Sequence, residues 1–148
     1  MGMVSISHPD ILTFIHAKND PAAFTNFNLS VKFPDVFMNQ FKDNPQTLHV
    51  VINPRTKKRY AMPHFLRVVY YTIEDLLPEG RASDDCYTLK EIWEMIIKGA
   101  SATGEHSIFF IDRVNEANPT PHSGKIEATN PCGETALTVF RVAQCGFN

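Results

Sequence analysis

The order of helical and strand patterns along the 148 residues predicts an α/β protein. Two segments carry this prediction. Residues 88–104 have the pattern of a capped amphipathic helix, and residues 107–112 follow as consecutive apolar side chains, typical of a buried strand. The composition agrees with a folded globular domain, since 43% of the residues are hydrophobic and 20% are charged.

The first third of the chain predicts two helices with a strand between them. A helix is expected over residues 7–20, with Ser7 as its cap and Pro9 in its first turn. Residues 26–31 (NFNLSV) alternate as a short strand. Residues 33–44 follow as an amphipathic helix whose phenylalanines recur at a spacing of four.

The middle of the chain predicts a hairpin followed by a segment of mixed character. Residues 48–62 form the hairpin, with a turn at Asn53-Pro54. Its tip carries four cations within residues 55–59, for which a solvated turn is favoured over phosphate contact. Residues 63–87 combine the β-prone run 67–73 with a turn-rich stretch, which suits a linker, an insertion or a mobile flap.

The last third begins with a helix, over residues 88–104, whose start, apolar face and end are all marked in the sequence. Thr88 and Glu91 have the spacing of a capping box, and Gly104 is a suitable stop. The helix between them has one apolar stripe, expected to be buried: Leu89, Ile92, Trp93, Ile96, Ile97 and Ala100. After the buried strand at 107–112, we expect a loop over residues 115–124 and then a short strand within 125–134 that runs into a tight turn.

Charge and cysteine content exclude several classes of protein. The formal net charge is −2, from 14 Lys and Arg against 16 Asp and Glu, so no overall basic field for nucleic acid is present. Cys86, Cys132 and Cys145 are too few for a disulfide framework. The sequence contains no apolar run of membrane-spanning length, no signal peptide, no GxGxxG and no P-loop pattern. A cytoplasmic protein with reduced thiols is therefore expected.

The segment Asn130-Pro131-Cys132-Gly133-Glu134 is the strongest candidate for chemistry. Pro131 fixes its own φ and Gly133 permits a tight turn, which presents the Cys132 thiol at a loop tip. Alternate side chains of such a segment point the same way, so an amide, a thiol and a carboxylate can converge on one small substrate. The amide can orient a hydroxyl, the carboxylate can take a proton, and the sulfur can act as nucleophile or radical carrier.

Each candidate also has a structural explanation. An isolated cysteine is more often a small buried apolar residue than a catalyst, so spacing alone favours a structural Cys132. His8 and His16 can share a helix face, but a surface role is favoured over metal binding because no ligand cluster accompanies them. Metal binding is equally disfavoured for four residues that lack ligand spacing: Glu105, His106, Asp112 and His122.

Three stretches, in this order, resemble the catalytic chain of ribonucleotide reductases, enzymes that remove the ribose 2′-hydroxyl to make deoxyribonucleotides. They are ISHPDILTFIHAKND (6–20), NFNLSV with FPDVFM (26–38) and IEATNPCGE (126–134). The longer stretch TGEHSIFFIDRVNEANPTPHSGKIEATNPCGE (103–134) is most similar to the adenosylcobalamin-dependent class II enzymes.

The resemblance implies a fold and residue roles. The fold is part of a ten-stranded α/β barrel, with the Asn-x-Cys-x-Glu loop at its centre. Cys132 resembles the thiyl-radical cysteine that abstracts the 3′-hydrogen of the ribose, and Glu134 the base for the 3′-hydroxyl. Asn130 resembles the hydrogen-bond partner that orients the substrate. Cys145 is a candidate second redox cysteine, although it falls late and its flanks differ from the family's.

The resemblance also implies partners. These are a ribonucleoside di- or triphosphate substrate, a dithiol reductant such as thioredoxin, and the rest of the catalytic chain or a complementing chain. Adenosylcobalamin would be the radical source, with its contacts outside these residues. No membrane and no direct nucleic-acid partner is expected. Two alternatives stay open: a class I large subunit with a separate metal-bearing radical subunit, and a non-catalytic remnant or interaction module.

By the same resemblance, residues 1–148 are a fragment of the catalytic barrel domain. Residues 63–87 are expected to be an insertion or flexible loop, and residues 135–148 a divergent tail. Met1-Gly2-Met3 resembles the end of a glycine-rich stretch, so the chain is expected to start inside the barrel. A sheet that lacks most of its strands has open edges, so we expect the isolated chain to be poorly stable or to oligomerise, and to be inactive.

Overall fold

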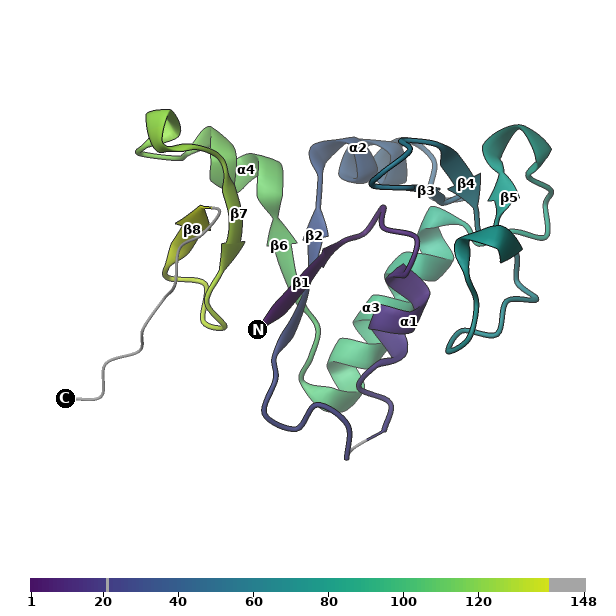
Figure 1. Cartoon of the computed structure of the whole chain (residues 1–148), viewed down its shortest axis with the longest axis horizontal. Helices are drawn as coiled ribbons and strands as arrows, with labels where there is room; N and C mark the ends of the chain where they lie inside the picture. The colour runs from purple at the N-terminus through teal and green to yellow at the C-terminus, as the bar shows by residue number, and fades with distance from the viewer. Residues whose placement is uncertain (21, 139–148) are drawn as a thin grey trace.

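A parallel three-stranded sheet lies at the centre of the molecule (Figure 1). The computed structural model describes residues 1–20 and 22–138. The strands are ordered β1-β2-β6, and their bounds are β1 (Gly2–Ser5), β2 (Leu29–Phe33) and β6 (Ser107–Phe110). Val31 is central in the register, since it pairs with Val4 on one side and Ile108 on the other. Because β2 is the middle strand, four of its five residues are buried.

Helices occupy the connections between the parallel strands, as parallel pairing requires. Helix α1 (Ile11–His16) lies between β1 and β2 in the chain, and α2 (Asp35–Asp43) and α3 (Leu89–Thr103) lie between β2 and β6. Helices α1 and α3 are side by side next to the sheet (Figure 1). The predicted α/β content is therefore confirmed, while the parallel sheet in the described part of the chain has three strands and does not close into a barrel.

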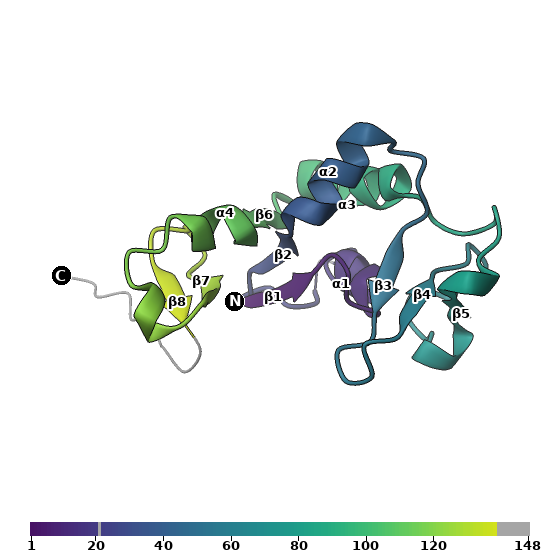
Figure 2. The same cartoon turned by 90° about the horizontal axis from the view of Figure 1, so that it is seen from above.

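Two smaller antiparallel sheets lie at opposite ends of the elongated molecule (Figure 2). One contains β3 (Val50–Ile52), β4 (Arg59–Ala61) and β5 (Leu77–Pro78). The other is the hairpin of β7 (Ile126–Thr129) and β8 (Ala136–Thr138). The remaining elements are short helices: η1 (Ile73–Asp75), η2 (Glu79–Arg81), α4 (Ile111–Glu116) and η3 (Pro121–Ser123).

The hydrophobic core is built around an aromatic cluster between the sheet and α2 and α3. Phe33 is fully buried, and its ring meets Phe37 edge-on at 5.2 Å and Trp93 edge-on at 5.4 Å between centroids. Phe41 stacks on Phe37 at 6.2 Å. The sequence placed Phe33 in the following helix, whereas the structure places it at the end of β2, so one phenylalanine from the strand packs against others from the helix.

Helix α3 is formed as the sequence predicts. The Thr88 hydroxyl accepts from the backbone N–H of Glu91, the Glu91 carboxylate accepts from the backbone N–H of Thr88, and Gly104 ends the helix at φ +75°. The buried face is narrower than expected: Leu89, Ile92 and Ile96 are buried, whereas Ile97 is 43% exposed.

The start of the chain differs from the prediction. Residues 2–5 form an edge strand that the pattern did not indicate. Ser7 does not cap the first helix, because α1 begins at Ile11 with Asp10 at the cap position and no side-chain cap. The backbone carbonyl of Ser7 instead accepts from the N–H of Ile52, so this residue joins the segment before α1 to β3.

The region around β6 also differs. The run 107–112 was expected to be fully buried, but Ser107 and Phe110 are exposed because β6 is an edge strand of the sheet. The loop expected from residue 115 is preceded by α4, which extends to Glu116. The β-prone run 67–73 contains no strand.

Two buried histidines bind backbone carbonyls of α1 and of the segment that precedes it. Nε2 of His49 lies 3.0 Å from the carbonyl oxygen of Ile6, and Nε2 of His106 lies 3.0 Å from that of Phe14. A carbonyl can only accept, so Nε2 carries the proton in both rings. Of the helices in the described residues, none is long and apolar enough to cross a bilayer.

Candidate active site

The candidate turn lies at the tip of the β7–β8 hairpin, which confirms the predicted strand and tight turn. Thr129 pairs with Ala136 at the end of the ladder, and residues 130–135 connect the strands. The backbone N–H of Gly133 donates to the carbonyl of Asn130 at 3.0 Å and closes the turn. Gly133 has φ +83°, a conformation that glycine adopts without steric cost.

Asn130 is the organising side chain of this turn. It is 6% exposed, and its Oδ1 accepts from the backbone N–H of Thr135 at 3.0 Å. That bond fixes which end of the amide is oxygen, so Nδ2 points the other way and donates to Oε1 of Glu134. The buried hydroxyl of Thr129 donates to the carbonyl of Thr135 at 3.0 Å and supports the same arrangement.

The thiol of Cys132 projects from the tip as an exposed free cysteine. Of the three side chains that the sequence grouped, the structure brings Asn130 and Glu134 into contact. Within residues 1–20 and 22–138, no hydrogen bond joins Cys132 to either of them. Cys145 lies outside the described residues. The turn therefore offers an accessible sulfur beside an amide-anchored carboxylate.

Among the described residues, the hairpin is attached to the molecule by side-chain hydrogen bonds and not by strand pairing with the central sheet. Asn115 of α4 donates from Nδ2 to the carbonyl of Ile126 at 2.9 Å and accepts at Oδ1 from the N–H of Ile126 at 2.8 Å. Asn115 therefore binds both backbone groups of Ile126, the first residue of β7, as a neighbouring strand would. On the other side, Lys32 of β2 donates to the carbonyl of Glu127 at 3.2 Å and pairs with its carboxylate at 3.5 Å.

Replacing Asn115 by alanine is expected to destabilise the hairpin by about 1–3 kcal/mol, because both backbone groups of Ile126 lose their partner. Hydrogen exchange of the Ile126 amide measures this directly. Asn118→Ala is the matched control, since Asn118 makes an exposed bond to Gly124 and its loss leaves Ile126 untouched. Equal exchange rates at Ile126 in the two variants would contradict the role assigned to Asn115.

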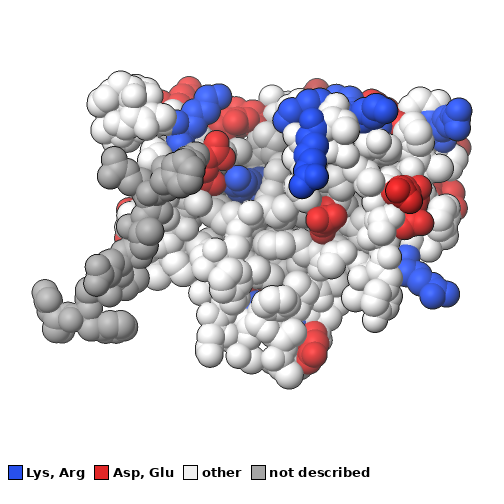
Figure 3. All heavy atoms as spheres, in the orientation of Figure 1, with Lys and Arg blue, Asp and Glu red and all other residues white. Residues whose placement is uncertain are grey.

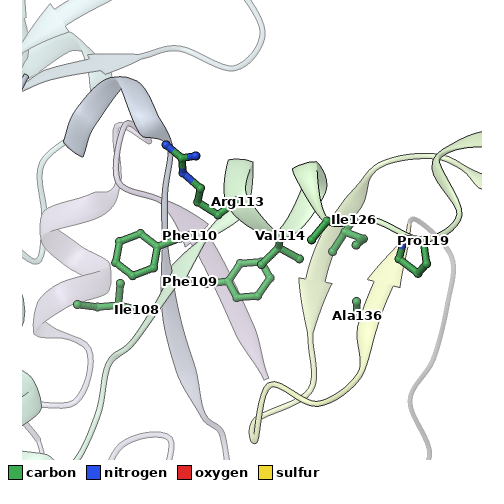
Figure 4. Close-up of a pocket in the computed structure, with 9 residues that line it drawn as sticks. Ile108, Phe109, Phe110, Arg113, Val114, Pro119, Ile126 and Ala136 are labelled. Atoms are coloured by element: carbon green, nitrogen blue, oxygen red, sulfur yellow. The ribbon is translucent and has the colours of Figure 1, made fainter. Parts of the chain in front are cut away.

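A shallow apolar hollow of about 500 Å³ separates the hairpin from β6 (Figure 4). Side chains from β6, α4 and both hairpin strands line it: Ile108, Phe109, Phe110, Arg113, Val114, Ala117, Pro119, Ile126 and Ala136. The charged member, Arg113, is paired with Asp35 at 3.1 Å and Glu116 at 3.0 Å. The surface between sheet and hairpin is therefore apolar, with its one lining charge neutralised locally.

Two other sequence candidates, Glu105 and Asp112, make tertiary contacts with residues far away in the sequence. Glu105 accepts from the N–H of Leu29 and pairs with Lys18 at 3.2 Å, and Asp112 accepts from the N–H of Asp35. In the described ranges, no three His, Cys, Asp or Glu side chains gather as a metal site. At the basic tip, Arg59 pairs with Glu79 at 2.6 Å. On the face shown in Figure 3, charges of both signs are mixed along one edge.

Several residues that build this region have no recognisable pattern in the sequence. Asn115 lies in a stretch interpreted as a loop, and its partner is 11 residues away. Thr129 and Thr135 read as ordinary strand and turn residues. Only the spacing of Asn130 and Glu134, which puts them on either side of a tight turn, could indicate that they meet.

Fold and turn together define an α/β domain that presents an exposed cysteine on a hairpin. The sequence matches the family described as the ribonucleotide reductase barrel domain over residues 1–145. The chain belongs to this family, and the resemblance that the motifs indicated is confirmed.

Curated relatives carry names that agree with the family. The chain is 36% identical over 147 residues to a vitamin B12-dependent ribonucleoside-diphosphate reductase of Mycobacterium tuberculosis, covering 99% of this chain and 18% of the relative. It is 33% identical to a protein of the same name from Thermoplasma acidophilum, covering 99% and 16%. A ribonucleoside-diphosphate reductase subunit alpha of Treponema pallidum is 27% identical, covering 94% and 17%. The chain thus spans less than a fifth of the length of these relatives.

Proposed function

We propose that this chain is the part of a vitamin B12-dependent ribonucleotide reductase that carries the radical cysteine. The observation that supports this most is the turn itself, in which an exposed Cys132 is flanked by the buried Asn130 and its partner Glu134. In the whole enzyme, the three parallel strands would form part of a ten-stranded α/β barrel, with the hairpin tip directed toward its centre. The relatives' names favour a ribonucleoside diphosphate as substrate.

The proposed reaction assigns one step to each side chain of the turn. A thiyl radical on Cys132 takes the hydrogen atom from C3′ of the ribose, so an S–H bond forms as the C3′–H bond breaks. Glu134 accepts the proton of the 3′-hydroxyl, while Asn130 holds the carboxylate in place. The 2′-hydroxyl then leaves as water with a proton from a dithiol, which also supplies two electrons and the proton for the new C2′–H bond and becomes a disulfide. Cys145 is the proposed candidate for one of those thiols. The S–H bond of Cys132 returns its hydrogen atom to C3′, which restores the thiyl radical, and Glu134 returns its proton to the 3′-oxygen.

The described residues meet one requirement for adenosylcobalamin, which is open access to the thiol. Cys132 is exposed, and a Cβ added at Gly133 would meet no atom within 4 Å. When bound, the cofactor would supply the radical to the sulfur. The hollow beside the hairpin is shallow and its one charged lining residue is already paired, so we do not assign the cofactor to it.

A class I large subunit is the second candidate. The relative from Treponema pallidum, named as a subunit alpha, favours it at 27% identity. The relatives named as vitamin B12-dependent are more similar, at 33–36%, and this difference favours the cobalamin enzyme.

The proposed function can be tested in a chimera. The matched segment of the Mycobacterium tuberculosis relative is replaced by this chain, and deoxyribonucleoside diphosphate formation is measured with adenosylcobalamin and a dithiol. Cys132→Ser is expected to abolish turnover, and Glu134→Gln to lower kcat by about 10²- to 10⁴-fold. Cys86→Ser, at a buried cysteine far along the chain from the turn, is the matched control and should retain activity. Undiminished turnover in Cys132→Ser would overturn the assignment.

A further inference from the structure

The two ends of the 63–87 segment are fastened together. Pro63 and Cys86 form an antiparallel bridge, and the backbone N–H of His64 donates to the carbonyl of Asp85 at 3.0 Å. The N–H of Tyr87 donates to the carbonyl of Met62 at 2.9 Å. These contacts form a neck where the segment leaves after β4 and returns before α3.

The side chain of His64 spans this neck between two carboxylates. Its Nδ1 lies 3.2 Å from Oδ1 of Asp85, and its Nε2 lies 3.1 Å from Oε1 of Glu91. The ring of Tyr87 packs edge-on against the imidazole at 4.5 Å between centroids. Ionised carboxylates only accept hydrogen bonds, so both contacts are made together only when both ring nitrogens carry a proton. A neutral imidazole would leave one carboxylate facing a lone pair.

Glu91 connects this neck to the start of α3. Its Oε2 accepts from the backbone N–H of Thr88 at 2.8 Å and from the Thr88 hydroxyl at 2.9 Å, which leaves Oε1 for His64. The carboxylate that caps the helix is therefore the same one that binds the imidazole. A change at His64 therefore affects both the neck and the first turn of α3.

We infer that His64 is a protonation-dependent clasp, which closes the neck of the 63–87 segment and joins it to α3 when the imidazole is charged. The charges that face the ring are Asp85 on the returning end of the segment and Glu91 on α3, while Tyr87 is a neutral neighbour. Partial burial alone would lower the pKa of His64, but the hydrogen bonds to Asp85 and Glu91 outweigh it and raise this pKa above its ordinary 6.5.

The sign of the pH dependence follows from that direction. A histidine with a raised pKa in the folded state stabilises closure fully below the ordinary pKa of 6.5. This stabilisation is lost as the pH rises through the higher pKa of the folded state. The neck is therefore expected to be tighter in mildly acidic solution than in mildly alkaline solution.

Cys86 provides a reporter of opening, because it lies in the bridge and its side chain is fully buried. In a full chain with Cys132→Ser and Cys145→Ser, the reaction of Cys86 with N-ethylmaleimide is followed by mass spectrometry from about pH 6.5 to about pH 8.5, a range in which the stabilisation by His49 is complete. Each rate is divided by the rate of the denatured chain at the same pH, which removes the ionisation of the thiol itself. The protection of Cys86 is expected to fall by about three- to fivefold as the pH rises. A change of this size corresponds to the loss of one exposed charge pair.

Substitutions separate the clasp from general effects of pH. In His64→Gln, the protection of Cys86 should be low and no longer fall with pH, whereas His122→Gln, at an exposed histidine, should behave as the parent does. A parent without pH-dependent protection, or a His64→Gln chain that keeps it, would overturn the inference. Should His64→Gln fail to fold, NMR titration of His64 decides: its midpoint should lie above 6.5 and fall toward that value in Asp85→Asn, and an unchanged midpoint would also overturn the inference.

Discussion

Replacement of Phe33 by alanine is expected to lower the free energy of unfolding by about 3–5 kcal/mol. Phe33 is fully buried, and its ring contacts Phe37 from α2, Trp93 from α3 and, at 6.3 Å, Phe110 from β6. Removal of the ring therefore leaves a cavity where three elements meet. Phe37 and Trp93 have little freedom to fill it, since each also packs on the ring of Phe41.

Urea titration followed by Trp93 fluorescence measures this loss, because Trp93 is the single tryptophan and lies against Phe33. Phe65→Ala is the matched control. Phe65 is 69% exposed, so its replacement should change stability by no more than about 0.5 kcal/mol. Similar losses in the two variants would show that the aromatic cluster is not the centre of the core.

Acidification is expected to cost about 3 kcal/mol of stability through His49 alone. Burial lowers the pKa of His49 to about 4 and outweighs the hydrogen bond to Ile6, which acts in the opposite direction. The folded state resists protonation at His49, whereas the unfolded state takes up the proton near pH 6.5. The contribution of His49 to the stability of the folded state is therefore complete above pH 6.5. It declines as the pH falls from there toward 4.

His49→Gln isolates this effect, since glutamine retains a donor for the Ile6 carbonyl and does not titrate. The free energy of unfolding of each chain is measured by urea titration at a series of pH values. The parent should lose about 3 kcal/mol more than the variant between neutral pH and pH 4, and the difference cancels the contribution of carboxylates such as Glu91. Parallel curves would contradict the assignment.

Local signals explain which elements could be predicted from the sequence. Helix α3 was predicted with its cap and stop because the Thr88–Glu91 capping box and Gly104 each act locally, at the helix end where they lie. Strand β1 and helix α4 were not, because each is short and depends on tertiary contacts: β1 on pairing with β2, and α4 on α2 and β7. Ser7 looked like a helix cap, yet its position is set by the contact of its carbonyl with β3.

The same distinction applies to the candidate site. The turn at Asn130–Glu134 was predictable because Pro131 and Gly133 dictate its geometry locally, and the spacing places two of its polar groups together. The attachment of the hairpin was not predictable, because Asn115 binds backbone groups of a residue 11 positions away and leaves no periodic pattern. The roles of Cys132, Glu134 and Asn130 in catalysis remain the proposal that the chimera tests.

The hairpin forms its own two-stranded sheet, so the position of the Cys132 thiol depends on how the base of the hairpin is held. From the clamp at Asn115 and Ile126 to the turn is about four residues of strand, or about 13 Å. A tilt of about 5° at that base displaces the tip by about 1 Å, a misplacement that can cost about a hundredfold in rate. In the proposed enzyme, the hydrogen bonds of Asn115 and Lys32 at the base of the hairpin would therefore determine how accurately the sulfur of Cys132 is positioned.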